Sequence, residues 1–78
     1  MFEKTVLLSN FTKVKSFVAL ASSLPYEVSL VEGKKRVDAK SMVGIFSLDL
    51  TKPLTVIADT DSVAILSKKL EPFALKKG

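Results

Sequence analysis

The spacing of apolar residues changes along the chain, and each spacing predicts one element of secondary structure. Residues 2–8 (FEKTVLL) are rich in strand-forming residues, which predicts a first strand with Val6 and Leu8 on one face. The following apolar residues recur every three or four positions, as on one side of an amphipathic helix. This helix is expected to have Asn10 as its N-cap and to end at Pro25. Its apolar stripe consists of Phe11, Val14, Phe17, Val18, Ala21 and Leu24.

The middle of the chain predicts a hairpin followed by a short helix. Apolar and polar residues alternate from Tyr26 to Val31 and Gly33 follows beside a charged tip, so the return strand is expected near residues 35–39. A second helix should then begin with Ser41 as its N-cap and end by Leu50, since a glycine in the middle of a strand would be unfavourable here. The residues that can share one face of this helix are Met42, Ile45, Phe46 and Asp49.

The last third of the chain predicts an inner strand and a third helix. Residues 54–58 (LTVIA) are apolar at almost every position, as expected of a strand buried on both faces. Asp59 and Asp61 would place negative charge at the start of the following helix, where the helix dipole favours it. Pro72 is expected to stop or kink this helix. Its apolar stripe consists of Val63, Leu66 and Leu70.

Together these elements predict one domain of the α+β class that spans residues 1–78. By the rules of layer packing, the order β-α-β-β-α-β-α gives a four-stranded antiparallel sheet with three helices on one face, an open-faced sandwich. The other face of the sheet fits this arrangement less well. Polar residues such as Thr5 and Ser29 suit solvent there, whereas Leu7, Val31 and Ile57 do not.

Composition narrows the possible functions. The chain contains no histidine and no cysteine, which removes most nucleophilic and metal chemistry, and neither a metal nor a cofactor is expected. The lack of disulfides and of a signal-peptide pattern fits a cytoplasmic protein. The longest charge-free stretch, residues 16–26, is shorter than the roughly 20 apolar residues that span a bilayer, so no membrane insertion is expected. The net charge of +4, carried partly by residues 34–36 and by Lys76 and Lys77, favours acidic partners.

Neither catalysis nor nucleic-acid binding has a clear sequence signal. Asp59 and Asp61 form the closest carboxylate pair, and helix capping explains them better than acid–base chemistry. Residues 32–36 contain a single glycine and lack the glycine-rich loop of a phosphate site. The aromatic residues in predicted strands are Phe2 and Tyr26, too few for a base-stacking platform. We therefore expect a protein that is not an enzyme and does not bind nucleic acid.

Residues 38–50 (DAKSMVGIFSLDL) combine a serine at a helix start with an apolar surface. An N-cap serine is usually structural and stabilises its helix by about 1 kcal/mol. A phosphate on Ser41 would also suit this place, because the free amides and the dipole of the helix favour negative charge. On so short a helix some apolar side chains must face outward, and apolar side chains exposed together suggest a docking patch. The candidate partner-binding residues are Lys40, Met42, Val43 and Phe46.

The segment AKSMVGIFSL, residues 39–48, resembles the regulatory serine region of HPr, the histidine-containing phosphocarrier protein of the bacterial sugar phosphotransferase system. The predicted order of elements is also that of HPr, so the resemblance covers nearly the whole chain. It implies an HPr-like fold, with Ser41 at the position that an ATP-dependent kinase phosphorylates. It also implies that Met42, Val43 and Phe46 belong to the helix through which such proteins contact enzymes and a transcriptional regulator.

The chain departs from HPr where the carrier chemistry resides. In HPr the first helix opens with a phosphorylatable histidine, followed two residues later by an arginine and then a proline. Here Asn10 takes the position of the histidine, and Thr12 and Lys13 follow in place of the other two. An amide cannot hold a transferable phosphoryl group, and the chain has no histidine at any other position that could replace it. A related subgroup of HPr-like proteins keeps the serine, lacks the histidine and regulates carbon catabolite repression.

The sequence thus predicts a bacterial, HPr-like regulatory module that docks protein partners and carries a phosphorylation switch at Ser41. By resemblance, the partners would be an HPr kinase, a transcriptional regulator or enzymes of the phosphotransferase system. Two alternatives stay open. One is a phosphocarrier with a non-standard acceptor residue. The other is a structural remnant, in which Ser41 is only an N-cap and Met42 and Phe46 belong to the core.

Overall fold

The strands and helices follow the order predicted from the sequence. The computed structural model describes residues 1–74, so Lys76 and Lys77 of the predicted basic cluster lie outside the described residues. The elements are β1 (Phe2–Val6), α1 (Phe11–Ser22), β2 (Val28–Glu32), β3 (Lys35–Asp38), α2 (Met42–Phe46), β4 (Leu54–Ala58), α3 (Val63–Lys69) and the 3-10 turn η1 (Glu71–Phe73).

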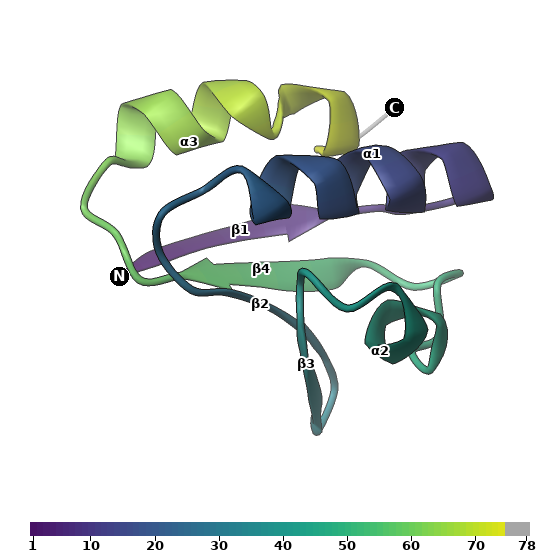
Figure 1. Ribbon diagram of the computed structural model, residues 1–78. Helices are drawn as coiled ribbons and strands as arrows, with labels where there is room; N and C mark the ends of the chain where they lie inside the picture. Colours follow the sequence, from purple (N-terminus) through teal and green to yellow (C-terminus); the bar gives the residue numbers. More distant parts are fainter. Residues whose placement is uncertain (75–78) are drawn as a thin grey trace.

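The four strands form one antiparallel sheet in the order β1-β4-β2-β3. Val56 of β4 lies opposite Lys4 of β1 on one side and opposite Leu30 of β2 on the other, which confirms the predicted inner strand. The hairpin turn between β2 and β3 contains Gly33 with a φ of 59°, in the left-handed region that glycine adopts without strain. Figure 1 shows α1 and α3 on the same side of the sheet, with α2 beside β3.

The core lies between the helices and one face of the sheet. Phe17 of α1, Ile45 of α2 and Leu66 of α3 are fully buried and belong to one cluster. The ring of Phe17 also meets the ring of Phe73 edge-on, with centroids 5.5 Å apart, so η1 is packed onto α1. The predicted α+β open-faced sandwich is therefore confirmed. The strand residues of this core are Phe2, Val6, Val28, Leu30, Leu54, Val56 and Ala58.

The outer face of the sheet consists of the alternate strand residues. Across the strands they form the rows Glu3–Ile57–Ser29–Asp38 and Thr5–Thr55–Val31–Arg36. Val31 and Ile57, which did not suit solvent, are half-buried. Each lies on an inner strand between two neighbouring side chains, and this placement accounts for their partial shielding.

The bounds of two elements differ from the predictions. The first strand ends at Val6, although Leu8 beyond it is still buried in the core. The first helix ends at Ser22, before Pro25 is reached. The reason is local capping, because the Ser23 hydroxyl donates a hydrogen bond of 2.6 Å to the carbonyl of Leu20.

The start of α3 also differs. Its N-cap is Ser62 rather than an aspartate, and no acidic residue lies in its first turn. A turn delays the helix, since the hydroxyl of Thr60 accepts the N–H of Ser62, while Asp61 lies 3.9 Å from the N-terminal amine. Leu66 and Leu70 of the predicted stripe are buried, but Val63 at the first helical position is 54% exposed. No helix within residues 1–74 is long and apolar enough to cross a membrane.

Candidate functional site

Ser41 begins α2, as the sequence predicts. Its backbone is extended, and its Oγ accepts a hydrogen bond of 3.1 Å from the N–H of Gly44. The preceding turn is held by Asp38, whose Oδ1 accepts the N–H of Lys40 at 2.9 Å and whose carbonyl accepts the N–H of Ser41 at 3.0 Å. Because Oγ acts as an acceptor in the cap, the hydroxyl hydrogen is not used by that bond. Ser41 is also exposed, so another protein has access to it.

An exposed aromatic pair joins α2 to α1. The rings of Phe11 and Phe46 are stacked, with centroids 5.9 Å apart and an interplanar angle of 11°. Phe11 is 59% exposed, Phe46 is 46% exposed, and Val43, three residues before Phe46, is 84% exposed. We call Phe11, Val43 and Phe46 the aromatic patch. Apolar side chains that gather on a surface in this way are typical of a protein-docking site.

The other predicted partner-binding residues have different surroundings. Met42 is half-buried and packs against the core, while Lys40 is exposed. A structural remnant would bury Met42, Val43 and Phe46 together, and Val43 and Phe46 are exposed. The exposed apolar side chains of α2 are therefore fewer than the apolar segment of the sequence suggests.

Sequence reasoning missed the part that Phe11 takes in this surface. Its spacing from Val14 placed it in the apolar stripe of the first helix, and Val14 is indeed buried. Phe11 occupies the first helical position, however, and its ring stacks on Phe46 rather than entering the core. The sequence did contain a signal for this exposure, because Phe11 directly follows the predicted N-cap. A residue in the first turn lies at the end of the helix, where less of its side chain faces the core.

Asn10 acts as the N-cap of α1. Its Oδ1 accepts the N–H of Lys13 at 2.8 Å, and the Lys13 ammonium donates to the carbonyl of Pro72 at 3.0 Å. The side-chain oxygen of Asn10 is thus engaged in starting the helix, which confirms the predicted cap. Within residues 1–74, no three histidine, cysteine, aspartate or glutamate side chains come together as candidate metal ligands.

The loop after α2 is organised by Asp49. Its Oδ1 accepts hydrogen bonds from the hydroxyl and the N–H of Thr51, at 2.6 and 3.1 Å. These bonds, the hydroxyl one foremost, lower the pKa of Asp49 below its ordinary value, and the charge of Lys52 acts in the same direction. The N–H of Asp49 donates to Glu32 at 3.2 Å, so the loop is also tied to the hairpin. The prediction that Asp49 shares a face of the second helix is wrong, because α2 ends at Phe46.

The sheet order and the three helices define an HPr-like fold, whose α1 and α2 carry the aromatic patch and Ser41. Among the solved structures that match the chain is the crystal structure of HPr-C-His from Thermoanaerobacter tengcongensis. The two chains are 27% identical with a TM-score of 0.74, and the match covers 90% of this chain and 86% of that one. No protein-family model and no curated protein sequence matches the chain. The structural likeness supports a phosphocarrier-type family.

Proposed function

We propose that this chain is a non-catalytic, HPr-like regulatory module that binds partner proteins through α1 and α2, with Ser41 as a kinase target. The observation that carries the proposal is the aromatic patch, whose three side chains are exposed. Two of them, Val43 and Phe46, lie on the short helix that the exposed Ser41 caps. Two stacked rings form a rigid apolar surface, and aromatic residues are enriched among the side chains that dominate binding at interfaces.

Phosphorylation would change the charge of this surface and leave its apolar side chains in place. In the kinase site, the Ser41 Oγ would attack the γ-phosphorus of ATP. The new O–P bond would form as the bond to ADP breaks, and the hydroxyl proton would pass to a base of the kinase. The added phosphate carries a charge of about −1.5 to −2 at neutral pH. Arginines of a partner would bind the phosphate, and Val43 and Phe46 would supply apolar anchors.

The proposal excludes phosphoryl transfer through histidine. Asn10 stands where the resemblance to HPr places the carrier histidine, and its side-chain oxygen accepts the N–H of Lys13. The amide nitrogen of an asparagine is not nucleophilic, because its lone pair is delocalised into the carbonyl. We therefore expect the chain to act on partners by binding and not by carrying a phosphoryl group.

The switch is tested by incubation with an HPr kinase and ATP, followed by intact-mass measurement. We expect one phosphate on the wild-type chain and none on Ser41→Ala. Ser47→Ala is the matched control, because Ser47 is an exposed serine at the opposite end of α2 and should leave phosphorylation unchanged. An unmodified wild-type chain, or a phosphate that persists in Ser41→Ala, would remove Ser41 from the proposal.

The docking surface is tested by affinity capture from the native cell. Phe46→Ala should lose the partner that the wild-type chain retains, with an unchanged circular dichroism spectrum. Ile65→Ala is the matched control, since Ile65 is 63% exposed but lies on α3. A partner that all three proteins capture equally would contradict docking through the aromatic patch.

Carrier activity is tested with phosphoenolpyruvate and the first enzyme of the phosphotransferase system. We expect no phosphate to be transferred to the chain. An acid-labile phosphate on any residue would instead establish the phosphocarrier with a non-standard acceptor. This result is independent of the kinase experiment, because a serine phosphate is stable to acid.

A further inference from the structure

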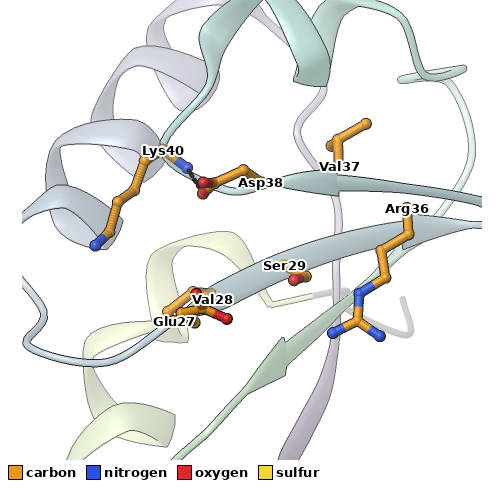
Figure 2. A pocket seen from close by; sticks show the side chains of 7 residues that line it. All are labelled: Glu27, Val28, Ser29, Arg36, Val37, Asp38 and Lys40. Atoms are coloured by element: carbon orange, nitrogen blue, oxygen red, sulfur yellow. Dashed lines mark hydrogen bonds between the residues drawn. The ribbon is translucent and has the colours of Figure 1, made fainter.

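The outer face of the sheet carries a pocket that the docking surface does not include. The pocket has a volume of about 370 Å³ and opens over β2, β3 and the turn that follows β3 (Figure 2). Ser29 and Asp38 lie opposite each other across β2 and β3, and Arg36 is on the same face of the sheet. This volume falls within the range of roughly 300 to 1,000 Å³ that is common for small-molecule sites.

Charges of both signs line the pocket. Glu27 and Asp38 contribute carboxylates, and Arg36 and Lys40 contribute cations. In the view of Figure 2, Lys40 and Arg36 lie toward opposite sides, with the two carboxylates and Ser29 between them. The four charges cancel, although the chain as a whole carries +4. The lining therefore differs in charge from the average surface of this protein.

The ion pairs found within residues 1–74 lie elsewhere on the molecule. One joins the N-terminal amine to Asp61 and the other joins Lys52 to Asp49. In this part of the chain, the only hydrogen bond found to a charged pocket side chain is that of Asp38 with the N–H of Lys40. The pocket charges are thus not consumed by one another and are available to a ligand.

A ligand that carries both charges matches this lining better than an ion of one sign. An anion alone would meet repulsion from Glu27 and Asp38, and a cation alone would meet repulsion from Arg36 and Lys40. A small zwitterion places an ammonium and a carboxylate close together and engages both kinds of group. Ser29, a half-buried residue, adds a hydroxyl that both donates and accepts hydrogen bonds.

We propose that this pocket binds a free α-amino acid, with its carboxylate on Arg36 and its ammonium on Asp38 and Glu27. The binding is weak, with a dissociation constant on the order of 1 mM, because ion pairs at an exposed site contribute little each. The pocket contains no residue of the aromatic patch, although Lys40, a predicted partner-binding residue, lines it. Amino-acid binding is therefore tested separately from partner docking.

The proposal is tested by titrating the 15N-labelled chain with L-glutamine and recording amide chemical shifts. We expect saturable shifts at residues around Ser29 and residues 36–40. N-acetyl-L-glutamine, which lacks the ammonium, and L-glutaminamide, which lacks the carboxylate, are the singly charged controls and should bind several-fold more weakly. The absence of saturable shifts, or equal binding of either control, would overturn the proposal.

Variants then assign the charges. Arg36→Gln and Asp38→Asn should each weaken L-glutamine binding by about fivefold. Asp38→Asn retains a side-chain oxygen that accepts the N–H of Lys40, so the turn before α2 is kept. The controls are Lys34→Gln at the hairpin tip and Glu3→Gln on the same sheet face but on β1, and both should bind like the wild-type chain. Unchanged affinity in both pocket variants would show that the shifts come from another site.

Discussion

Gly44 of α2 lies so close to Val37 of β3 that a Cβ at position 44 would be 3.2 Å from the Val37 Cβ. The same added atom would be 3.2 Å from the Oγ of Ser41, which caps the helix. The missing side chain therefore allows α2 to approach the hairpin while its first turn remains capped. The presentation of Ser41 depends on this one backbone position.

Gly44→Ala is expected to lower the free energy of unfolding by about 1 kcal/mol. Overpacking typically costs 1–3 kcal/mol, which exceeds the gain of about 1 kcal/mol from replacing glycine by alanine in a helix. Urea denaturation followed by circular dichroism measures the change. Gly33→Ala is the comparison variant, in which the added Cβ would meet nothing within 4 Å. Any decrease in its free energy of unfolding therefore comes from the φ of 59° alone. A Gly44→Ala chain as stable as the wild type would show that Val37 and Ser41 move aside freely.

The two serine N-caps should differ in their contribution to stability. Ser41→Ala is expected to cost about 1 kcal/mol, because it removes the acceptor of the Gly44 N–H. Ser62→Ala should cost much less, because the Ser62 side chain makes no cap hydrogen bond. Ser41→Asp preserves an acceptor and should recover most of the loss. Chemical denaturation of the three variants checks this order, and equal costs for the two alanine variants would contradict it.

The stacking of Phe11 on Phe46 should be measurable as a coupling energy. In a double-mutant cycle of Phe11→Ala and Phe46→Ala, we expect a coupling of about 0.5–1.5 kcal/mol in unfolding free energy. The same cycle with Phe11→Ala and Ile65→Ala should give none, because Ile65 is on α3. A coupling of zero in the first cycle would mean that the two rings do not hold each other in solution.

The pKa of Asp49 should depend on the hydroxyl of Thr51. Thr51→Val removes the hydroxyl donor and keeps the backbone donor, so the Asp49 pKa should rise part of the way to its ordinary value. A lowered pKa in the folded chain contributes stability above the unfolded pKa, and that contribution is lost as the pH falls through the folded pKa. As the pH falls from the unfolded pKa of Asp49 through its lowered folded pKa, Thr51→Val should therefore lose less unfolding free energy than the wild-type chain. An NMR titration of the Asp49 carboxyl measures the pKa directly, and an unchanged value would refute the assignment.

The sequence predicts most of the fold because each element carries its own local signal. Asn10 and Ser41 are recognisable as N-caps from the residue types that follow them, and both caps form. The apolar run 54–58 identifies the inner strand, because a strand with neighbours on both sides needs little polar surface. The glycine of the hairpin has the positive φ that its position suggests.

Several of the remaining differences come from contacts between elements that are distant in sequence. Phe11 has the spacing of a core residue, and only the approach of α2 to α1 gives it a partner on the surface. The start of α3 differs for a local reason, because the turn held by the Thr60 hydroxyl and the N–H of Ser62 makes Ser62 the N-cap in place of Asp61. The pocket needs the pairing of β2 with β3, which brings Asp38 opposite Ser29. Strand register and helix packing are not visible in the local pattern from which these residues were interpreted.

The position of β4 has a consequence for the order of folding. Phe2 of β1 pairs with Ala58 of β4, and β2 pairs with the opposite edge of the same strand. During synthesis, β1 therefore waits for a partner made roughly fifty residues later, while the β2–β3 hairpin needs only local pairing. Until residues 54–58 leave the ribosome, β1 and β2 have unpaired edges that favour association with other chains. The middle strand is thus the element that closes the sheet, and a chain stalled before residue 54 should be aggregation-prone rather than partly functional.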